Sequence, residues 1–385
     1  MYQPPTGVRD LLPSDVLQKL WIEERLQRVF QQWGYQRIIT PTLERIETLQ
    51  ASGSVDLSGI LQLRDAEGAS LGLRPDPTPS LARAVATRLI DTPWPVRLSY
   101  QTNVFRSTAR PQEFYQAGIE LIGAGGAFAD GEVLLLLNDA LQALGLSEWT
   151  LILGAVGFTR SWLSAAPEAL RPRLRQALSS LDRVALEAET SLDPELKRAL
   201  LLLFDLRGEP KQVLAKAYTL ALSDTQQQDL QTLESLVGWL EAQGITVILD
   251  LSLVEAFDYY TGMVFEICVR DCLLGRGGRY DELLASYGRP APGVGFSLNL
   301  EALQQVLMQD KQRPLVSRPE GGVLIVPKTP QAWSHALAKA AHLRSQSPER
   351  VELELLGRSP EAVLVYAEQI GIAQILWVEE DGTTA

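Results

Sequence analysis

The first clear pattern in the chain is a stretch of apolar residues at helical spacing near its start. These residues fall within positions 14–33 and are Val16, Leu20, Leu26, Val29 and Phe30. Side chains spaced in this way lie on one face of a helix, so the segment predicts an amphipathic helix that packs on a core. Ser14 is a candidate N-cap for this helix, and Gly34 is a candidate stop.

Short runs of strand-forming residues follow, separated by turn residues and by further helical stretches. The predicted strands cover residues 37–40, 71–73, 96–101, 119–122, 150–153, 245–250 and 262–269, and the predicted helices cover residues 82–89 and 131–144. Residues 292–307 are predicted to form a strand that enters a helix. The long strand at 262–269 suits an antiparallel sheet.

Residues 159–241 differ in character, because strand formers become rare and Leu, Ala, Arg and Glu dominate. Pro172, Pro194 and Pro210 divide this part into shorter predicted helices. We interpret it as a helical insertion between two halves of the sheet. The polar, proline-containing segment 311–321 is the predicted linker. Strands and helices alternate over residues 322–385, which is typical of a small α/β unit.

The predicted fold is therefore α+β. An antiparallel sheet flanked by helices occupies residues 1–310, carries the insertion, and precedes a C-terminal α/β domain. The 385 residues are 46% hydrophobic and 21% charged, which suits a globular protein with a sizeable core. The two cysteines, Cys268 and Cys272, imply no disulfide framework and fit the cytoplasm. We see no signal-peptide pattern and no apolar run long enough to cross a membrane.

The formal net charge of −12 bears on possible partners. A protein that holds nucleic acid usually offers a basic face, because neutralising phosphates dominates the affinity. An acidic total therefore argues against tRNA as the main partner.

Eight separated segments resemble histidyl-tRNA synthetases, and they occur in the order found in that family. They read TGVRDLLP, GYQRIITPTLE, LRPDPT, VFRSTARPQEFYQAGIELIG, AFADGEVLLL, DYYTGMVFE, GGRYDELL and GVGFSLNLEAL, and they cover about residues 5 to 310. Each segment is weak alone, but eight in order are hard to obtain by chance. The resemblance implies a class II aminoacyl-tRNA synthetase-like fold, which forms a dimer through the signature that ends at Pro41.

Part of this resemblance can be understood from the residues alone, as a pocket for an amino acid. Such a pocket must pair a buried ammonium, a carboxylate and a side chain. The candidates are Asp76, Thr78 and Gln116 for the ammonium, Glu120 for an imidazole N–H, and Arg106, Tyr259, Tyr260 and Tyr280 around the ligand. The resemblance assigns similar roles to these positions.

Simpler interpretations exist for several of these residues. Asp76 lies between two prolines and could be a turn residue. Tyr259 and Tyr260 could belong to the core of a strand, in which case at most one of them would line a pocket. Glu120 lies within an apolar strand, where its carboxylate must be solvated or paired.

The departures from the synthetase pattern all fall on residues that activate the amino acid. Thr108 stands where the second signature carries a glutamate, Glu255 stands where the family has its catalytic arginine, and Ala302 replaces an arginine that holds ATP. Losing one preorganised donor costs about 3–4 kcal/mol of transition-state stabilisation. Glu255 would also repel ATP and a ligand carboxylate. We therefore expect no useful aminoacyl transfer, and either another cation serves a bound amino acid or the ligand is held differently. The candidate cations are Arg74, Arg106 and Arg279.

A synthetase-like chain that lacks these residues and has a shortened C-terminal unit resembles the regulatory subunits of ATP phosphoribosyltransferase. That resemblance implies a non-catalytic subunit without a cofactor, which pairs with a short-form catalytic subunit in a cytoplasmic hetero-octamer. The complex joins ATP to phosphoribosyl pyrophosphate in the first step of histidine biosynthesis. L-Histidine would regulate this step through its differential affinity for two states of the complex.

Two other functions stay open on the sequence. The first is a divergent histidyl-tRNA synthetase-like aminoacyl ligase, against which Thr108, Glu255 and Ala302 argue. The second is a binding module with a synthetase-like fold that recruits RNA, against which the acidic charge and the shortened C-terminal unit argue.

Overall fold

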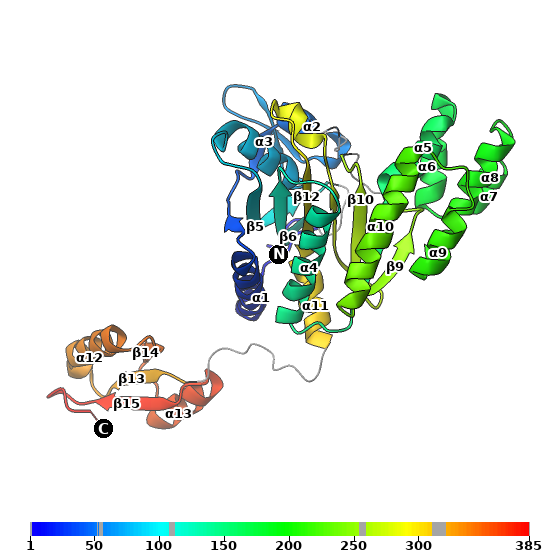
Figure 1. The fold of residues 1–385 in the computed structure, drawn as a ribbon. Helices are drawn as coiled ribbons and strands as arrows, with labels where there is room; N and C mark the ends of the chain where they lie inside the picture. Colours follow the sequence, from blue (N-terminus) through cyan, green and yellow to red (C-terminus); the bar gives the residue numbers. More distant parts are fainter. Residues whose placement is uncertain are drawn as a thin grey trace. The chain divides into compact units, whose positions relative to one another are not determined.

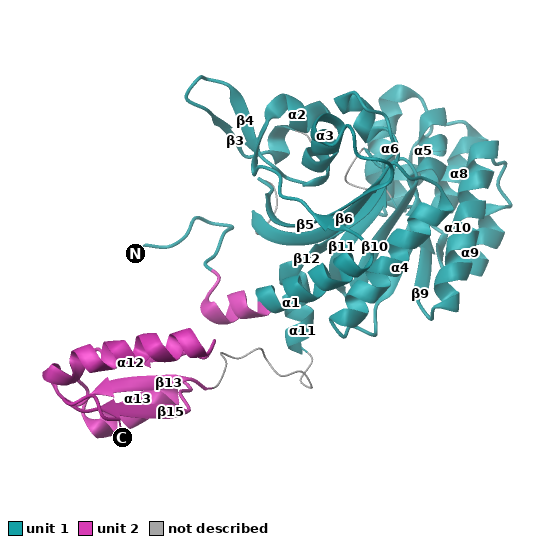
Figure 2. Cartoon of the chain, turned by 60° about the vertical axis from the view of Figure 1, so that its left-hand side comes forward, with its two compact units in different colours: residues 1–10, 19–313 teal, residues 11–18, 314–385 magenta. Residues whose placement is uncertain are grey.

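The computed structural model describes residues 2–51, 53, 57–107, 112–253, 259–309 and 321–384. Thr108, Glu255 and most of the predicted linker lie outside these residues. The chain divides into two compact units (Figure 2). The first consists of Met1–Asp10 with Lys19–Arg313, and the second of Leu11–Gln18 with Pro314–Ala385.

A nine-stranded sheet organises the first unit (Figure 1). Its strands are β1 (Gln36–Arg37), β5 (Val96–Phe105), β6 (Glu113–Ile122), β7 (Thr150–Ala155), β8 (Arg207–Gly208), β9 (Thr246–Asp250), β10 (Met263–Val269), β11 (Cys272–Arg279) and β12 (Gly293–Asn299). Their order is β1-β5-β6-β12-β11-β10-β7-β9-β8. Neighbours pair antiparallel, except that β1 runs parallel to β5 and β7 runs parallel to β9.

The period of two along each strand sorts the side chains of this sheet to two faces. One face carries Ile119, Phe265 and Phe296 into the large core. Helices from distant parts of the sequence cover this face, namely α1 (Pro13–Gln32), α4 (Ala127–Ala143), α10 (Asp224–Ala242) and α11 (Leu300–Gln309). The other face packs on α3 (Thr78–Arg88) and the short helix η3 (Leu283–Tyr287) through a smaller core. The candidate site lies on this second face.

A small three-stranded sheet leads into α3. It is formed by β2 (Leu43–Arg45), β3 (Gln62–Arg64) and β4 (Ser70–Leu73), in the order β2-β4-β3, and is accompanied by α2 (Ile46–Ala51) and η1 (Leu57–Gly59). Because β4 ends at Leu73 and α3 begins at Thr78, the LRPDPT segment is a short strand-to-helix connection. This connection brings Asp76 and Thr78 to the face of the large sheet.

Helices between β7 and β9 form the predicted insertion (green in Figure 1). They are α5 (Val156–Ala165), η2 (Glu168–Leu170), α6 (Arg171–Ser179), α7 (Arg183–Glu187), α8 (Pro194–Leu203), α9 (Pro210–Ala217) and α10. Pro172, Pro194 and Pro210 each lie in the first turn of a helix, where the missing N–H costs no hydrogen bond. Ser223 and Gln226 form a capping box at the start of α10. The prolines therefore begin helices, as their predicted role as dividers requires.

The second unit contains a parallel sheet of β14 (Val351–Leu353), β13 (Val323–Pro327) and β15 (Gln374–Val378), in that order. Helix α12 (Trp333–Gln346), preceded by η4 (Pro330–Ala332), packs on one face of this sheet, and α13 (Pro360–Gln369) packs on the other. Successive strands joined by helices give the predicted α/β arrangement.

Several local predictions were wrong. Ser14 is not an N-cap, because α1 already begins at Pro13. The first predicted strand ends at Arg37 instead of Thr40. The sequence GRGG at residues 275–278 predicts a glycine-rich turn in the wall of the pocket, but this segment is the middle of β11, since each of its residues pairs with β10 and β12. Among the described residues, no helix has the length and apolar content needed to span a bilayer.

Candidate ligand pocket

The floor of the candidate site is formed by β6, β12 and β11, on the sheet face that packs on α3. Gly295 lies opposite Glu120 on the neighbouring strand, and Gly278 lies opposite Gly295 on the next. A Cβ on Gly295 would lie 2.1 Å from Oε2 of Glu120, and a Cβ on Gly278 would lie 2.6 Å from the ring of Tyr260. Glycine at these two positions leaves room for the polar side chains above the sheet.

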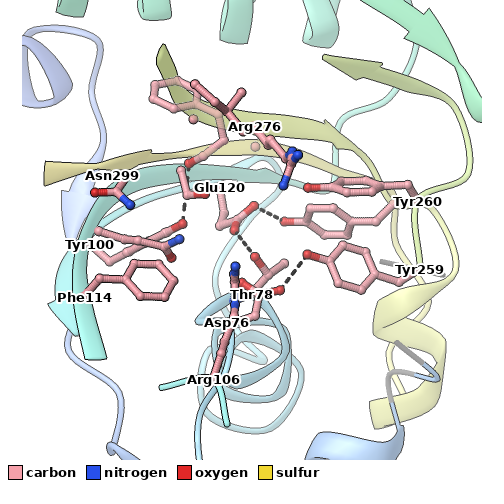
Figure 3. A pocket seen from close by; sticks show the side chains of 17 residues that line it. Asp76, Thr78, Tyr100, Arg106, Phe114, Glu120, Tyr259, Tyr260, Arg276 and Asn299 are labelled. Atoms are coloured by element: carbon pink, nitrogen blue, oxygen red, sulfur yellow. Dashed lines mark hydrogen bonds between the residues drawn. The ribbon is translucent and has the colours of Figure 1, made fainter. Parts of the chain in front are cut away.

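A cavity of about 240 Å³ opens above this floor (Figure 3). It is lined by all of the predicted ligand-binding residues, namely Asp76, Thr78, Arg106, Gln116, Glu120, Tyr259, Tyr260 and Tyr280. They come from four separate parts of the sequence: the start of α3, strand β6 with the end of β5, the approach to β10, and the end of β11. The structure thus brings the predicted residues together, and their binding of a ligand stays a prediction.

Glu120 lies near the centre of this cavity and is 2% exposed. The hydroxyl of Thr78 donates a hydrogen bond to its Oε1 at 2.7 Å, and the hydroxyl of Tyr280 donates to its Oε2. Burial raises the pKa of Glu120 to about 8, although both hydrogen bonds act in the opposite direction. At neutral pH this carboxyl is therefore mostly protonated, and an incoming N–H donor would favour its ionisation.

Asp76 is the second buried acid of the pocket. The hydroxyl of Tyr259 donates to its Oδ2 at 2.6 Å, and the backbone N–H of Thr78 donates to its Oδ1 at 3.2 Å. Burial raises the pKa of Asp76, while these hydrogen bonds and Arg106 lower it. Asp76 makes the local hydrogen bond of a turn residue and also lines the cavity, so the two interpretations are compatible.

Tyr259 and Tyr260 both line the cavity, contrary to the alternative in which both occupy a strand. They precede β10, which begins at Met263, so strand alternation does not apply to them. Their ring centroids are 4.8 Å apart, and the ring of Tyr280 meets that of Tyr259 edge-on at 5.9 Å. The three rings form an aromatic wall beside the two buried acids.

Gln116 supplies an unsatisfied acceptor. Its side-chain Oε1 is buried and has no hydrogen-bond partner among the described residues. Buried polar atoms are nearly always paired, and Gln116 lines the cavity, so a polar ligand is one way to supply the missing partner. An ammonium group would provide the missing donor.

The three candidate cations differ in whether they line the cavity. Arg74 donates to the backbone carbonyls of Thr40, Pro41 and Asn103 and does not line the cavity. Arg279 pairs with the fully buried Asp130, and it does not line the cavity either. Arg106 lines it, donates to the carbonyl of Pro75, and lies with its guanidinium carbon 5.0 Å from the ring centroid of Phe114. Of the three predicted cations, only Arg106 reaches the pocket.

Sequence reasoning missed several lining residues, and a signal for some of them was available. The missed residues with polar or aromatic side chains are Tyr100, Phe114, Arg276, Phe296, Ser297 and Asn299. Phe114 alternates with Gln116 along β6, and Ser297 with Asn299 along β12, so the period of two would have placed each on the floor. Arg276 was missed because its segment was interpreted as a turn.

Ala302 is the one predicted site of lost catalysis that the structure describes. It lies in the first turn of α11, where its backbone N–H donates to Oδ1 of Asn299 at 3.0 Å. The methyl side chain of Ala302 has no charge and no hydrogen-bond donor with which to bind a phosphate. The arrangement can hold a small zwitterion with a side-chain N–H donor, since acceptors, aromatic rings and a guanidinium converge on one cavity.

Comparisons with known proteins show the family of the chain. Residues 7–303 match the histidyl-tRNA synthetase family. The ATP phosphoribosyltransferase regulatory subunit of Gloeobacter violaceus is 65% identical over 384 residues, which is all of this chain and 98% of that protein. The protein of the same name from Trichormus variabilis is 48% identical, with the same coverage of both chains.

Solved structures show the same fold. A Bacillus halodurans protein described as an ATP phosphoribosyltransferase regulatory subunit/histidyl-tRNA synthetase superposes with a TM-score of 0.83 at 32% identity, covering 98% of both chains. Histidyl-tRNA synthetase from Nostoc sp. PCC 7120 superposes with a TM-score of 0.78 at 23% identity, covering 99% of this chain and 92% of that one. The predicted class II synthetase-like fold is confirmed.

Proposed function

This chain belongs to the family of ATP phosphoribosyltransferase regulatory subunits, and we propose that its pocket binds L-histidine as the feedback effector of a separate catalytic subunit. The observation that carries the proposal is the convergence of Asp76, Gln116 and Glu120 on one buried cavity. An ammonium would satisfy Asp76 and the orphan oxygen of Gln116. An imidazole N–H would be accepted by Glu120, between the aromatic rings.

The partner in this proposal is a short-form catalytic subunit, which joins ATP to phosphoribosyl pyrophosphate in the first step of histidine biosynthesis. Histidine can regulate it only by binding one state of the complex more tightly than another. The role of this chain is then to carry the sensor, in the cytoplasm. A hetero-octamer would allow several sensors to act on each assembly.

Self-association through the first class II signature forms part of the same proposal. Pro41 is flanked by Ile39, which is 82% exposed, and by Leu43, which is 43% exposed. Large apolar side chains on a short edge segment suit burial against a second copy. Size measurement by light scattering on the wild type and on Ile39→Asp checks this point, because the charge should shift the protein toward the monomer.

Reconstitution tests the regulatory function. The catalytic subunit is assayed alone and with this chain, each with and without L-histidine. We expect this chain to raise the activity and to make it sensitive to histidine. A catalytic subunit that is fully active and fully inhibited by histidine on its own would contradict the proposal.

The alternative of an aminoacyl ligase is not favoured. The curated relatives carry the regulatory name, and Ala302 offers no cation to ATP. ATP–pyrophosphate exchange in the presence of histidine would reveal the ligase if it existed, and we expect no exchange above background.

A further inference from the structure

We propose that Arg276 receives the carboxylate of the bound amino acid and so selects amino acids over the corresponding amines. This inference rests on the proposed histidine pocket and names the residue that serves the ligand's negative end. Arg276 lines the cavity from β11, and Figure 3 shows its guanidinium directed toward the space beside Glu120 and Tyr260.

The strand register places Arg276 on the pocket face. It lies opposite Glu266 on β10 and opposite Ser297 on β12. Residues opposite one another in adjacent strands point to the same face, and Ser297 alternates along β12 with Gly295, the floor residue beneath Glu120. Arg276 and Glu120 therefore project from the same side of the sheet, two strands apart.

Glu266 fixes the orientation of the guanidinium. Its Oε1 accepts from Nε of Arg276 at 2.8 Å, and its side chain is 18% exposed whereas that of Arg276 is 40% exposed. An arginine anchored in this way keeps a fixed orientation, and a guanidinium fork matches a carboxylate with two parallel hydrogen bonds. A half-exposed position at the pocket edge also suits a group that must meet an entering ligand.

The acidic side chains around the cavity would repel a ligand carboxylate, so a cation is needed to bind it. Asp76, Glu120 and Glu266 contribute three acids, and a bound carboxylate would add a fourth negative group. Arg106 is already engaged, because it donates to the carbonyl of Pro75 and lies near Asp76; burial lowers the pKa of Arg106, and the charge of Asp76 acts against that effect. Asp76 is also the expected partner of the ligand's ammonium. Arg276 brings a second positive charge to the same cavity, beside Glu120 and Tyr260 (Figure 3).

The consequence is a selectivity that separates L-histidine from histamine, which keeps the ammonium and the imidazole but lacks the carboxylate. A hydrogen bond to a charged group contributes roughly 1.5–3 kcal/mol, which corresponds to a change in Kd of about 10- to 150-fold. The complete protein, in complex with its catalytic subunit, should bind histidine tighter than histamine by about this factor.

Calorimetric titration of both ligands into the wild type and into Arg276→Met tests the inference. We expect the variant to lose roughly 10- to 100-fold in histidine affinity while its histamine affinity changes less than about threefold. Arg276→Lys, which keeps the charge but not the fork, should bind histidine with intermediate affinity. Arg97→Met is the matched control, because Arg97 also forms a half-exposed ion pair in the same sheet, with Glu132, and does not line the cavity. It should leave both affinities unchanged.

Each outcome decides between the inference and the function on which it rests. Equal losses for histidine and histamine in Arg276→Met, or no loss for histidine, would overturn the role of Arg276 while the histidine pocket stands. A wild-type complex that binds neither ligand would overturn the histidine pocket, and the inference with it.

Discussion

The hydroxyl of Tyr280 donates a hydrogen bond to Oε2 of Glu120, across 160 positions of sequence. Both residues are buried, and the same carboxylate accepts from Thr78 through its other oxygen. Two donors thus hold the carboxyl group in one orientation, at the centre of the proposed histidine pocket. A fixed acceptor of this kind can select a ligand N–H by position as well as by charge.

Removing that donor should weaken histidine binding. Tyr280→Phe leaves Glu120 with one protein donor fewer, and the hydrogen bond from Tyr280 is one of the effects that lower the pKa of Glu120. We therefore expect a higher pKa and an affinity for histidine reduced roughly five- to tenfold, from the typical energy of one hydrogen bond. Calorimetric titration at pH 7 gives the measurement. Tyr287→Phe, which loses a hydroxyl bonded to the carbonyl of Thr48 outside the pocket, should bind as the wild type does.

The raised pKa of Glu120 also predicts a pH-dependent stability. The folded-state pKa is about 8 and the ordinary glutamate value is about 4.3, so the folded protein binds the proton more tightly than the unfolded chain. The free energy of unfolding must then fall as the pH rises from about 4 to 8, and the loss is complete above the folded-state pKa. Glu120→Gln removes this dependence. We expect chemical denaturation to find the variant equal to the wild type near pH 4.5 and more stable by a few kcal/mol near pH 8.5.

Other groups titrate over the same interval, so the difference between the two proteins is the quantity to follow. The prediction fails if that difference is the same at both pH values. Asp130→Asn is not a suitable control, because it would break the buried ion pair with Arg279. Glu361→Gln, at an exposed position in the second unit, is the better choice: a backbone hydrogen bond and Ser359 lower the pKa of Glu361, so this variant should show no gain in stability as the pH rises.

Ligand affinity should depend on pH with the opposite sign. If Glu120 accepts an imidazole N–H, it must be ionised in the complex, so binding near pH 7 releases a proton. Affinity for histidine should therefore rise between about pH 6 and pH 8. Calorimetry in two buffers of different ionisation enthalpy measures the released proton directly. Glu120→Gln should bind more weakly and release none, whereas an unchanged proton release in this variant would assign the titration to another group.

The position of the pocket could be predicted from the sequence, but several residues that line it could not. Asp76, Gln116 and Glu120 were predictable because each belongs to a segment with a recognisable partner in synthetases. Arg276 was not, because finding it requires the register of β11 between β10 and β12, and pairing register depends on contacts distant in sequence. A register shift in the β10–β11 pair, next to Cys268, breaks the simple alternation that would have revealed it.

Long, periodic segments were predicted well and short ones poorly, for a physical reason. α13 and β15 follow the alternation of helices and strands predicted for residues 322–385, since turn residues mark the ends of both. The two-residue β1 owes its existence to pairing with β5, which no local pattern contains. Tyr259 and Tyr260 both reach the pocket because they lie outside any strand, and local sequence alone allows either arrangement.

The floor of the pocket yields the sharpest test of its construction. A Cβ on Gly295 would lie 2.3 Å from the carbonyl oxygen of Ile119 as well as close to Glu120, so β12 and β6 would have to separate. Gly295→Ala should cost about 1–3 kcal/mol in the free energy of unfolding and should reduce histidine binding severely. Gly238→Ala is the matched control, because Gly238 lies within α10 and its added methyl would meet nothing within 4 Å. That change should stabilise the protein by about 0.5–1 kcal/mol, through the better helix propensity of alanine, and should leave binding intact.

Thermal unfolding and calorimetric titration of both variants give the comparison. Equal behaviour of the two alanine variants would show that the floor is not packed against Glu120 as the structure has it.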